Sequence, residues 1–414
     1  MENFMLGELF GLSRQFLSLK NQSYRRYFIR RTDLSHRMNI LIGARGVGKT
    51  TTLIQSLLDS VAGDLQSPKI LYLQADHFLM KNLKLYEIAE YFVQHGGKYL
   101  AIDEIHKYPD WSMELKSIFD TFEELRIFAS GSSALEIAQG SHDLSRRALV
   151  YRMQGLSFRE YLEMRYSVSL PAIPLDTLLT EHLSSTQSIL STLSAKREKV
   201  LPAFKAYLRE GYYPYSQSLN SVEHYKMALE QNVHVTLESD LTAIYPELTG
   251  RSIGRIKRLL SFIANQVPFT PNWTKIAGVL ELGDIRTVKQ YFQYLEAAEL
   301  VLTFGSQSKK FKSLENPEKI FLNNPNLMYA LASSLPEVGT LRETFFANML
   351  MCDHDVTIPG RGDFQVDQGP VFEIGGAKKG FEQLQESEKG FVAADDIEVG
   401  YDRKIPLWLF GFVY

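Results

Sequence analysis

A glycine-rich run at residues 43–50, Gly-Ala-Arg-Gly-Val-Gly-Lys-Thr, constrains the fold of this chain more than any other feature. It fits G-x-x-x-x-G-K-[ST], the pattern of a loop that binds nucleotide phosphates. The apolar run Met38–Ile42 before it indicates a buried strand, and residues 51–58 after it have helical spacing. A strand, a glycine loop and a helix start direct backbone N–H groups and the positive helix end at an anion. The sequence therefore predicts a triphosphate-binding loop inside an α/β domain.

The loop assigns roles to its last residues. Lys49 is expected to reach the β- and γ-phosphates, and the Thr50 hydroxyl to ligate Mg²⁺. The glycines are required because a Cβ atom would block the approach of the phosphates to the backbone. The chain has no Asn-Lys-x-Asp base-reading motif, so ATP is expected rather than GTP. The predicted nucleotide-binding residues are Gly43, Ala44, Arg45, Gly46, Val47, Gly48, Lys49, Thr50 and Thr51.

A second motif, Tyr-Leu-Ala-Ile-Asp-Glu at residues 99–104, has the Walker B pattern of an apolar strand that ends in two acids. Asp103 is expected to hold Mg²⁺, because a hard cation prefers oxygen ligands. Glu104 is expected to orient and deprotonate the attacking water. Side chains alternate along a strand, so adjacent acids at its end can serve these separate purposes.

A third buried strand, Leu125–Ser130, is followed by Gly-Ser-Ser. A polar residue at its tip would lie between the two motifs and contact the γ-phosphate or the water. Ser132 and Ser130 are the candidates for this sensor role. The alternative for Ser133 is a cap on a helix over Ala134–Ala138.

Two arginines, Arg146 and Arg147, follow this strand. Either is a candidate arginine finger, acting in cis or across a subunit boundary, that stabilises charge on the transferring phosphoryl group. A surface salt bridge is the competing interpretation of both.

Composition limits the class of protein. At 414 residues the chain is long enough for two to four domains. A net charge of -3 argues against a generally basic nucleic-acid coat but allows local basic patches. The single cysteine, Cys352, excludes an internal disulfide framework and a cysteine-rich zinc site. The chain shows no signal-peptide layout and no apolar run of about 20 residues, so we expect a cytoplasmic protein without membrane contact.

Strand and helix signals alternate through residues 38–153, which predicts a parallel sheet covered by helices. Residues 156–235 look helical and suggest a lid over the nucleotide. The expected architecture is a P-loop α/β core with a helical lid, a winged helix and a C-terminal α+β domain. The corresponding boundaries are 1–155, 156–240, 241–315 and 316–414.

The winged-helix prediction rests on three helices and a small β-wing. The helices are expected at 252–265, 272–280 and 284–299, and the wing strands at 300–304 and 309–312. If the third helix enters a major groove, it presents one polar face to double-stranded DNA. A role in protein–protein or interdomain contact is the equal alternative. The residues of that face are Arg286, Lys289, Gln290 and Gln293.

The last segment carries spaced acids. Glu343 lies in a predicted helix, and Asp363 and Glu373 lie in two predicted strands. This is the layout of a PD-(D/E)XK nuclease, in which carboxylates collect a divalent metal and a lysine activates water. Gly375 stands where that lysine is expected, and Lys379 is out of phase. The three acids therefore predict a vestigial metal site, with loss of cleavage favoured over retention.

A basic run interleaved with aromatics covers residues 24–37. Such a composition suits contact with nucleic acid or a nucleotide base. A solvated strand pair that leads into the core is the favoured alternative.

With these motifs the chain resembles bacterial and archaeal AAA+-type ATPases whose C-terminal domain of unknown function is related to restriction-endonuclease-like folds. The resemblance implies an ATP-dependent function and places Lys49, Thr50, Asp103 and Glu104 at the ATPase site. It also implies roles for Ser132 and for Arg146 or Arg147. The stretches that carry it are residues 43–50, 99–111, 129–137, 144–162, 210–214, 372–380 and 395–414.

The leading hypothesis is an ATPase whose nucleotide cycle acts on a bound macromolecule, with DNA as the expected partner. Two alternatives are an ATP-gated nuclease that uses the C-terminal domain and a non-catalytic switch in which ATP binding assembles a complex. A homo-oligomer or a protein partner is compatible with all three hypotheses.

Overall fold

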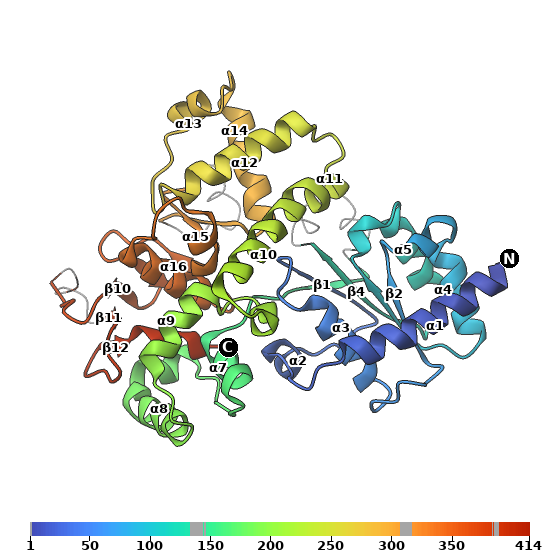
Figure 1. Cartoon of the computed structure of the whole chain (residues 1–414), viewed down its shortest axis with the longest axis horizontal. Coiled ribbons are helices and arrows are strands. Elements are labelled where there is room, and N and C mark those ends of the chain that lie inside the picture. The colour runs from blue at the N-terminus through green and yellow to red at the C-terminus, as the bar shows by residue number, and fades with distance from the viewer. Residues whose placement is uncertain (1, 133–143, 145, 307–316, 383, 385–388) are drawn as a thin grey trace. The chain divides into compact units, whose positions relative to one another are not determined.

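The computed structural model describes residues 2–132, 144, 146–306, 317–382, 384 and 389–414 of the chain. They form two compact units, Met1–Gln154 with Val235–Thr249, and Gly155–His234 with Gly250–Tyr414. Figure 1 shows the elements of both. None of the described helices is long and apolar enough to cross a membrane.

The first unit is built on the predicted parallel sheet. Its order is β2-β3-β4-β1-β5, and each neighbouring pair runs parallel. Strand β4, the third predicted buried strand, separates β1 from β3, so its tip lies between the two motifs. The strands are β1 (Met38–Gly43), β2 (Ile70–Gln74), β3 (Tyr99–Asp103), β4 (Arg126–Ser132) and β5 (Leu149–Arg152).

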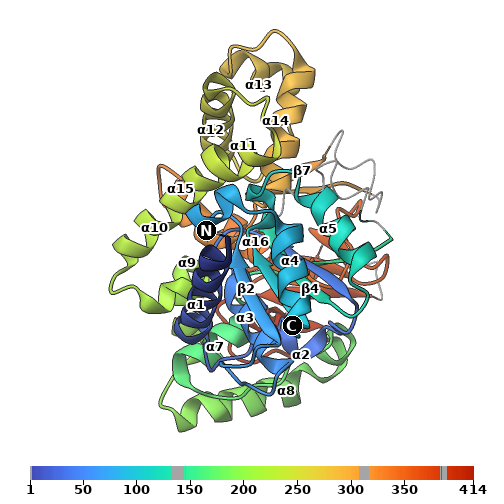
Figure 2. The same ribbon diagram turned by 90° about the vertical axis from the view of Figure 1, so that its right-hand side faces the viewer.

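Side-chain alternation divides the core of this unit between the two faces of the sheet. Tyr72 packs with one apolar cluster, whereas its neighbours Leu71 and Leu73 pack with the other. Helix α3 contributes to the first cluster, helices α4 and α5 to the second, and α1 to both. Figure 2 shows α1, α4 and α5 around the strands. The helices are α1 (Glu2–Lys20), α2 (Tyr27–Arg31), α3 (Lys49–Asp59), α4 (Leu85–Gln94) and α5 (Trp111–Thr121).

A distant segment completes the first unit. Residues Val235–Thr249 form a π-helical turn, Thr236–Asp240, and α11 (Leu241–Ile244). Helix α11 contacts the 3₁₀ turn Ile105–Lys107 that follows β3. The predicted boundary between residues 240 and 241 falls inside this segment.

The second unit begins with the helices expected from residues 156–235. Ser157 forms a capping box with Glu160 at the start of α7. Residues 183–198 belong almost entirely to α8. The helices are α7 (Phe158–Tyr166), α8 (Leu175–Ala195), α9 (Val200–Glu210) and α10 (Val222–Val235).

Three helices and a two-stranded ribbon follow, close to the predicted positions: α12 (Gly250–Ala264), α13 (Trp273–Val279), α14 (Ile285–Ala297) and β6 (Val301–Phe304). Asn272 and Asp284 cap α13 and α14 with their side chains. The second predicted wing strand, 309–312, lies outside the described residues. Strand β6 pairs instead with β7 (Lys319–Leu322), across the predicted boundary at residue 315. The winged-helix assignment therefore stays a proposal.

The end of the chain forms a second five-stranded sheet of order β12-β11-β10-β9-β8. Strands β10, β11 and β12 run parallel, whereas β9 and β8 are added antiparallel. The elements are α15 (Pro325–Leu331), α16 (Val338–Leu350), β8 (Val356–Thr357), β9 (Phe364–Val366), β10 (Val371–Gly375), β11 (Gly390–Ala394) and β12 (Lys404–Pro406).

Candidate nucleotide site

The phosphate loop joins the end of β1 to the start of α3. Gly43 ends the strand at φ 154°, and a Cβ atom there would collide with the carbonyl oxygen of Met153. Gly48 precedes the helix in the left-handed region, at φ 104°. Both positions favour glycine, one because of space and the other because of backbone conformation. The loop thus has the strand–turn–helix geometry predicted from its motif.

Lys49 lies inside the loop. Its buried ammonium group donates to the carbonyl oxygens of Gly43 and Ala44, at 2.7 and 3.0 Å. A cation held at the rim of a loop of backbone N–H groups suits a chain of phosphates.

Arg26 supports the loop from outside, a role that the sequence did not indicate. Its buried guanidinium donates to the carbonyl oxygens of Val47 and Gln154, at 2.6 and 3.0 Å. The favoured interpretation of residues 24–37 as a strand pair is wrong, because Tyr27–Arg31 form the short helix α2. One arginine of the basic run thus holds the backbone of the phosphate loop.

Asp103 receives three hydroxyl groups from three different elements. Thr50 Oγ1 donates to its Oδ2 atom at 2.7 Å, and Tyr72 donates to the same oxygen at 2.8 Å. Ser130 donates to Oδ1. Burial and the charge of Asp103 raise the pKa of the Tyr72 phenol. A hydroxyl and a carboxylate in direct contact beside a phosphate loop are the oxygen ligands that Mg²⁺ prefers, so these residues fit the predicted metal.

Glu104 leaves the strand at once. Its backbone adopts φ 55° and its N–H donates to Ser130 Oγ at 3.2 Å, while its carboxylate stays 24% exposed. Asp103 is 2% exposed. The two adjacent acids therefore occupy different environments, as their separate predicted roles require.

The two candidate sensor serines are both brought to the site. Ser130 contacts Asp103 through its hydroxyl, whereas the N–H of Ser132 donates to Nδ1 of His106 at 3.3 Å. Ser133 and the helix expected at Ala134–Ala138 lie outside the described residues. The sensor role of Ser132 stays a prediction.

Arg146 and Arg147 are not brought to the phosphate loop. They precede β5, which runs parallel to β1. They therefore lie at the amino-terminal ends of these strands, opposite the loop at the carboxyl end of β1. Arg147 pairs with Asp120 through two contacts of 2.8 Å, and Arg146 is exposed. This placement does not fit an arginine finger that acts within the same chain. A finger in trans stays a prediction.

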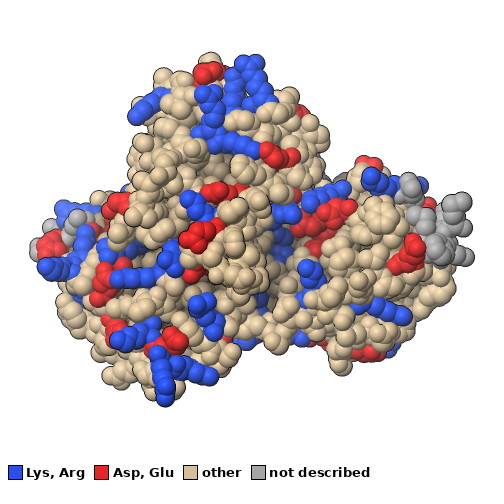
Figure 3. All heavy atoms as spheres, in the orientation of Figure 1, with Lys and Arg blue, Asp and Glu red and all other residues tan. Residues whose placement is uncertain are grey.

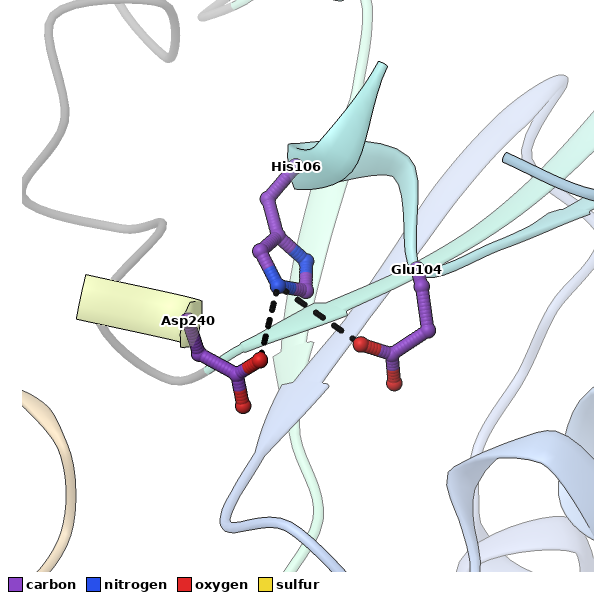
Figure 4. A group of neighbouring side chains, drawn as sticks. All are labelled: Glu104, His106 and Asp240. Atoms are coloured by element: carbon purple, nitrogen blue, oxygen red, sulfur yellow. Dashed lines mark ion pairs between the residues drawn. The ribbon is translucent and has the colours of Figure 1, made fainter. Parts of the chain in front are cut away.

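A cluster of ionisable side chains lies beside Glu104 and was not predicted from the motifs. His106 Nε2 lies 3.6 Å from Glu104 Oε2 and 3.8 Å from Asp240 Oδ1 (Figure 4). Asp240 also pairs with Arg45 of the phosphate loop, at 3.3 Å. The only sequence signal was an unassigned His-Lys pair after the Walker B acids, and nothing marked Asp240, which lies 136 residues beyond Glu104.

The second unit holds the three acids of the predicted vestigial metal site. Asp363 Oδ2 accepts the N–H of Ile374 at 2.7 Å, which fixes Asp363 beside Glu373 on β10. Burial, and then the charge of Asp363, raise the pKa of Glu343. Burial also raises the pKa of Glu373, again with a contribution from Asp363. The ionised Asp363 carboxylate therefore repels both Glu343 and Glu373 in their ionised forms.

Lys379 occupies the space that a side chain at position 375 would need. A Cβ atom on Gly375 would lie 2.7 Å from the Cβ and Cγ atoms of Lys379. The Lys379 ammonium group pairs with Glu373. Lys379 lies four residues after Gly375, the position where the motif expects a lysine, and its side chain still reaches the acids.

Comparisons with known proteins agree with this geometry in the first unit. A family model described as "AAA domain" matches residues 35–162, and one described as "Domain of unknown function (DUF8612)" matches residues 201–337. Among curated proteins, "Uncharacterized protein MJ1637" of Methanocaldococcus jannaschii is 26% identical over 289 residues. The match covers 66% of this chain and 58% of that protein.

Two solved structures show weaker likeness. AMPPCP-bound DnaA from Aquifex aeolicus has a TM-score of 0.26 at 14% identity, covering 69% of this chain and 86% of that one. A DNA polymerase III gamma subunit-related protein from Thermotoga maritima has a TM-score of 0.26 at 10% identity, covering 70% and 99%. The family match, the motifs and the parallel sheet make residues 35–162 a P-loop domain of the AAA class.

Proposed function

We propose that this protein binds ATP with Mg²⁺ and hydrolyses it at the phosphate loop of its AAA domain. The observation that carries the proposal is the direct contact between Thr50 and Asp103, 2.7 Å long, beside the buried ammonium group of Lys49. The hydroxyl comes from the phosphate loop after β1, and the carboxylate comes from the end of β3, the next strand but one in the sheet.

Each residue of the site has a separate role in this proposal. Lys49 and the N–H groups of the loop hold the phosphates, and Thr50 and Asp103 hold the metal. Bound Mg²⁺ would neutralise charge on the phosphate oxygens. Glu104, partly exposed and adjacent to Asp103, is placed to orient the attacking water and accept its proton.

Steady-state phosphate release from ATP tests this proposal. Replacing Lys49 with Ala removes the loop cation and should abolish both nucleotide binding and release. A matched control is Lys69→Ala, which removes an exposed lysine at the opposite end of the unit's strands, just before β2. Release that is absent from the wild type, or equal in wild type and Lys49→Ala, would overturn the proposal.

We further propose that the nucleotide cycle acts on double-stranded DNA held by α12, α13 and α14. Figure 3 shows Lys and Arg side chains gathered over this region. Residues 250–299 contain seven Lys or Arg against four Asp or Glu, and Glu299 is buried. The basic residues are Arg251, Arg255, Lys257, Arg258, Lys275, Arg286 and Lys289.

The polar residues of the third helix support this proposal. Arg286, Gln290 and Gln293 are on α14, and Arg286 is exposed near its start. The ammonium group of Lys289 lies 5.3 Å from the Trp273 ring centroid, which holds this side chain against α13. A basic face beside polar side chains on one helix suits phosphate contacts together with base contacts.

DNA binding measured against salt concentration tests this partner. Removing one phosphate-binding side chain should reduce the salt slope by about 1, so Arg251→Ala with Arg258→Ala should lower both affinity and slope. Lys226→Ala, an exposed lysine on α10, is the control. Equal affinity and slope in all variants, or no stimulation of ATP hydrolysis by DNA, would contradict a DNA partner.

A second candidate function, ATP-gated cleavage of nucleic acid, is favoured by Lys379. The PD-(D/E)XK pattern needs a lysine near its acids to activate water, and the pairing of Lys379 with Glu373 supplies one despite Gly375. This observation weighs against the expectation that the site has lost cleavage.

Incubation of supercoiled plasmid with Mg²⁺ or Mn²⁺, with and without ATP, separates the two candidates. Lys379→Ala and Asp363→Asn should each abolish nicking. Lys378→Ala is a matched control because this neighbouring lysine is exposed. If wild type and Asp363→Asn behave alike, the second unit does not cleave.

A further inference from the structure

The acid Asp240 reaches the nucleotide site from outside the matched AAA domain. It lies on the segment Val235–Thr249, which packs in the first unit although the chain on both sides of it belongs to the second. The matched AAA domain ends at residue 162. A change in the second unit is therefore connected, through the backbone, to a residue beside Glu104.

Asp240 pairs with cations from the phosphate loop and from the turn after the Walker B strand. Its side chain is 4% exposed, and both of its oxygens lie 3.3 Å from the Arg45 guanidinium of the phosphate loop. Lys107 Nζ lies 3.7 Å from Oδ1. Burial alone would raise the pKa of Asp240, but His106, Arg45 and Lys107 outweigh it and keep the pKa below its usual value. A buried carboxylate of this kind requires such partners.

The tautomer of His106 follows from its neighbours. Nδ1 accepts the N–H of Ser132 at 3.3 Å, so neutral His106 carries its proton on Nε2. The Nε2 atom is fully buried and makes no hydrogen bond in the described residues. Because it carries a proton, Nε2 is not free to ligate a metal together with Glu104 and Asp240. It is a donor placed between two acceptors.

Glu104 and Asp240 compete for the same two donors. His106 Nε2 lies 3.6 Å from Glu104 and 3.8 Å from Asp240 (Figure 4). Lys107 Nζ lies 3.8 Å from Glu104 and 3.7 Å from Asp240, and it also donates to Asp76 at 3.2 Å. A donor that is engaged by one carboxylate is withdrawn from the other, so the position of Asp240 determines how firmly Glu104 is held.

Resting on the proposed hydrolysis at this site, we propose that Asp240 is a positioning residue that releases Glu104 for catalysis. With Asp240 in place, it shares His106 and Lys107 with Glu104, so the Glu104 carboxylate is held less firmly and can bind the attacking water. When the segment Val235–Thr249 withdraws Asp240, both donors turn to Glu104 and hydrolysis stops.

Kinetics of the full chain test this inference. Asp240→Asn keeps the shape but removes the charge that attracts the two donors. Because a positioned base contributes about 10²–10⁴ in rate, partial capture of Glu104 should lower kcat by about tenfold. The KM for ATP should change less than kcat, since Lys49 and Thr50 keep their contacts although Arg45 loses its charged partner. Glu247→Gln, the same change at an exposed position of the same segment, is the control.

A second substitution distinguishes positioning from damage to the fold. Lys107→Met in the Asp240→Asn background removes a cation that pairs with Glu104. The double variant should therefore have a kcat severalfold above that of Asp240→Asn alone. A merely structural Asp240 predicts further loss in the double variant. Equal kcat in wild type and Asp240→Asn, or additive losses, would overturn the inference while leaving the ATPase intact. If wild type and Lys49→Ala are equally inactive, the proposed function fails and the inference with it.

Discussion

Asp103 is the residue on which the nucleotide site is centred, because hydroxyls from a loop and two strands converge on it. The motif predicted Thr50 as its neighbour, and Ser130 was proposed only as a sensor. Tyr72 was not foreseen, because a tyrosine in a buried strand looks like core until the strand order brings β2 beside β3. Long-range partners of this kind depend on the tertiary arrangement and leave no local signal.

Removing one of these hydroxyls tests how much Asp103 depends on them. Tyr72→Phe deletes a buried hydrogen bond to a carboxylate, which should lower the free energy of unfolding by about 1–3 kcal/mol. Chemical denaturation measures it, with Tyr99→Phe, at the far end of β3, as the control. An equal loss in both variants would show that the contact with Asp103 is not responsible.

The ionised state of Asp240 gives the stability of the first unit a pH dependence of known sign. Its pKa is lower in the folded chain than its usual value of about 4, so its stabilisation is present above that value. It is lost as the pH falls through the lower, folded pKa. Thermal unfolding of wild type and Asp240→Asn should therefore differ at pH 7 and converge in acid. A difference that grows in acid would contradict this assignment.

Elements in this chain were predictable where a short pattern determines them. The apolar run before the phosphate loop, the Ser157 cap and the Asp284 cap each specify a boundary through neighbouring residues. The pairing of β6 with β7 and the return of residues 235–249 to the first unit were not predictable. Both join segments that are distant along the chain and whose own composition is compatible with other partners.

We expect the acidic site of the second unit to be stabilised by a divalent metal ion. The pKa values of Glu343 and Glu373 are raised, so the stability from their protonated forms is present below about pH 4 and lost as pH rises through the folded values. A divalent ion that relieves the repulsion should raise the melting temperature at pH 7.5 more than at pH 5.

Differential scanning fluorimetry with Mn²⁺ measures this shift. Asp363→Asn removes the charge that couples the two glutamates, so the metal-dependent shift should disappear in this variant. Lys378→Ala should retain it. A wild-type melting temperature that is indifferent to Mn²⁺ at neutral pH would argue against a metal site.

At the scale of the whole molecule, the position of Arg146 and Arg147 leaves a role for a second copy. Both lie at the ends of the strands opposite the phosphate loop. Either arginine can therefore reach a nucleotide site only on a neighbouring chain. If they do, a variant with Arg146→Ala and Arg147→Ala should be inactive alone but active when mixed with Glu104→Gln. The first variant supplies Glu104 and the second supplies the arginines.

The mixing experiment needs one control, because Arg147 also pairs with Asp120. Asp120→Asn breaks that pair and keeps both arginines, so it should remain active. Mixtures no more active than the sum of their components would rule out a finger in trans.

Single-turnover hydrolysis of bound ATP shows whether Glu104 promotes the reaction at the phosphate loop. Rates and dissociation constants are measured in the same samples of wild type and Glu104→Gln. We expect equal affinity and a rate about 10²–10⁴ lower in the variant. Equal rates at equal affinity would show that Glu104 does not promote hydrolysis.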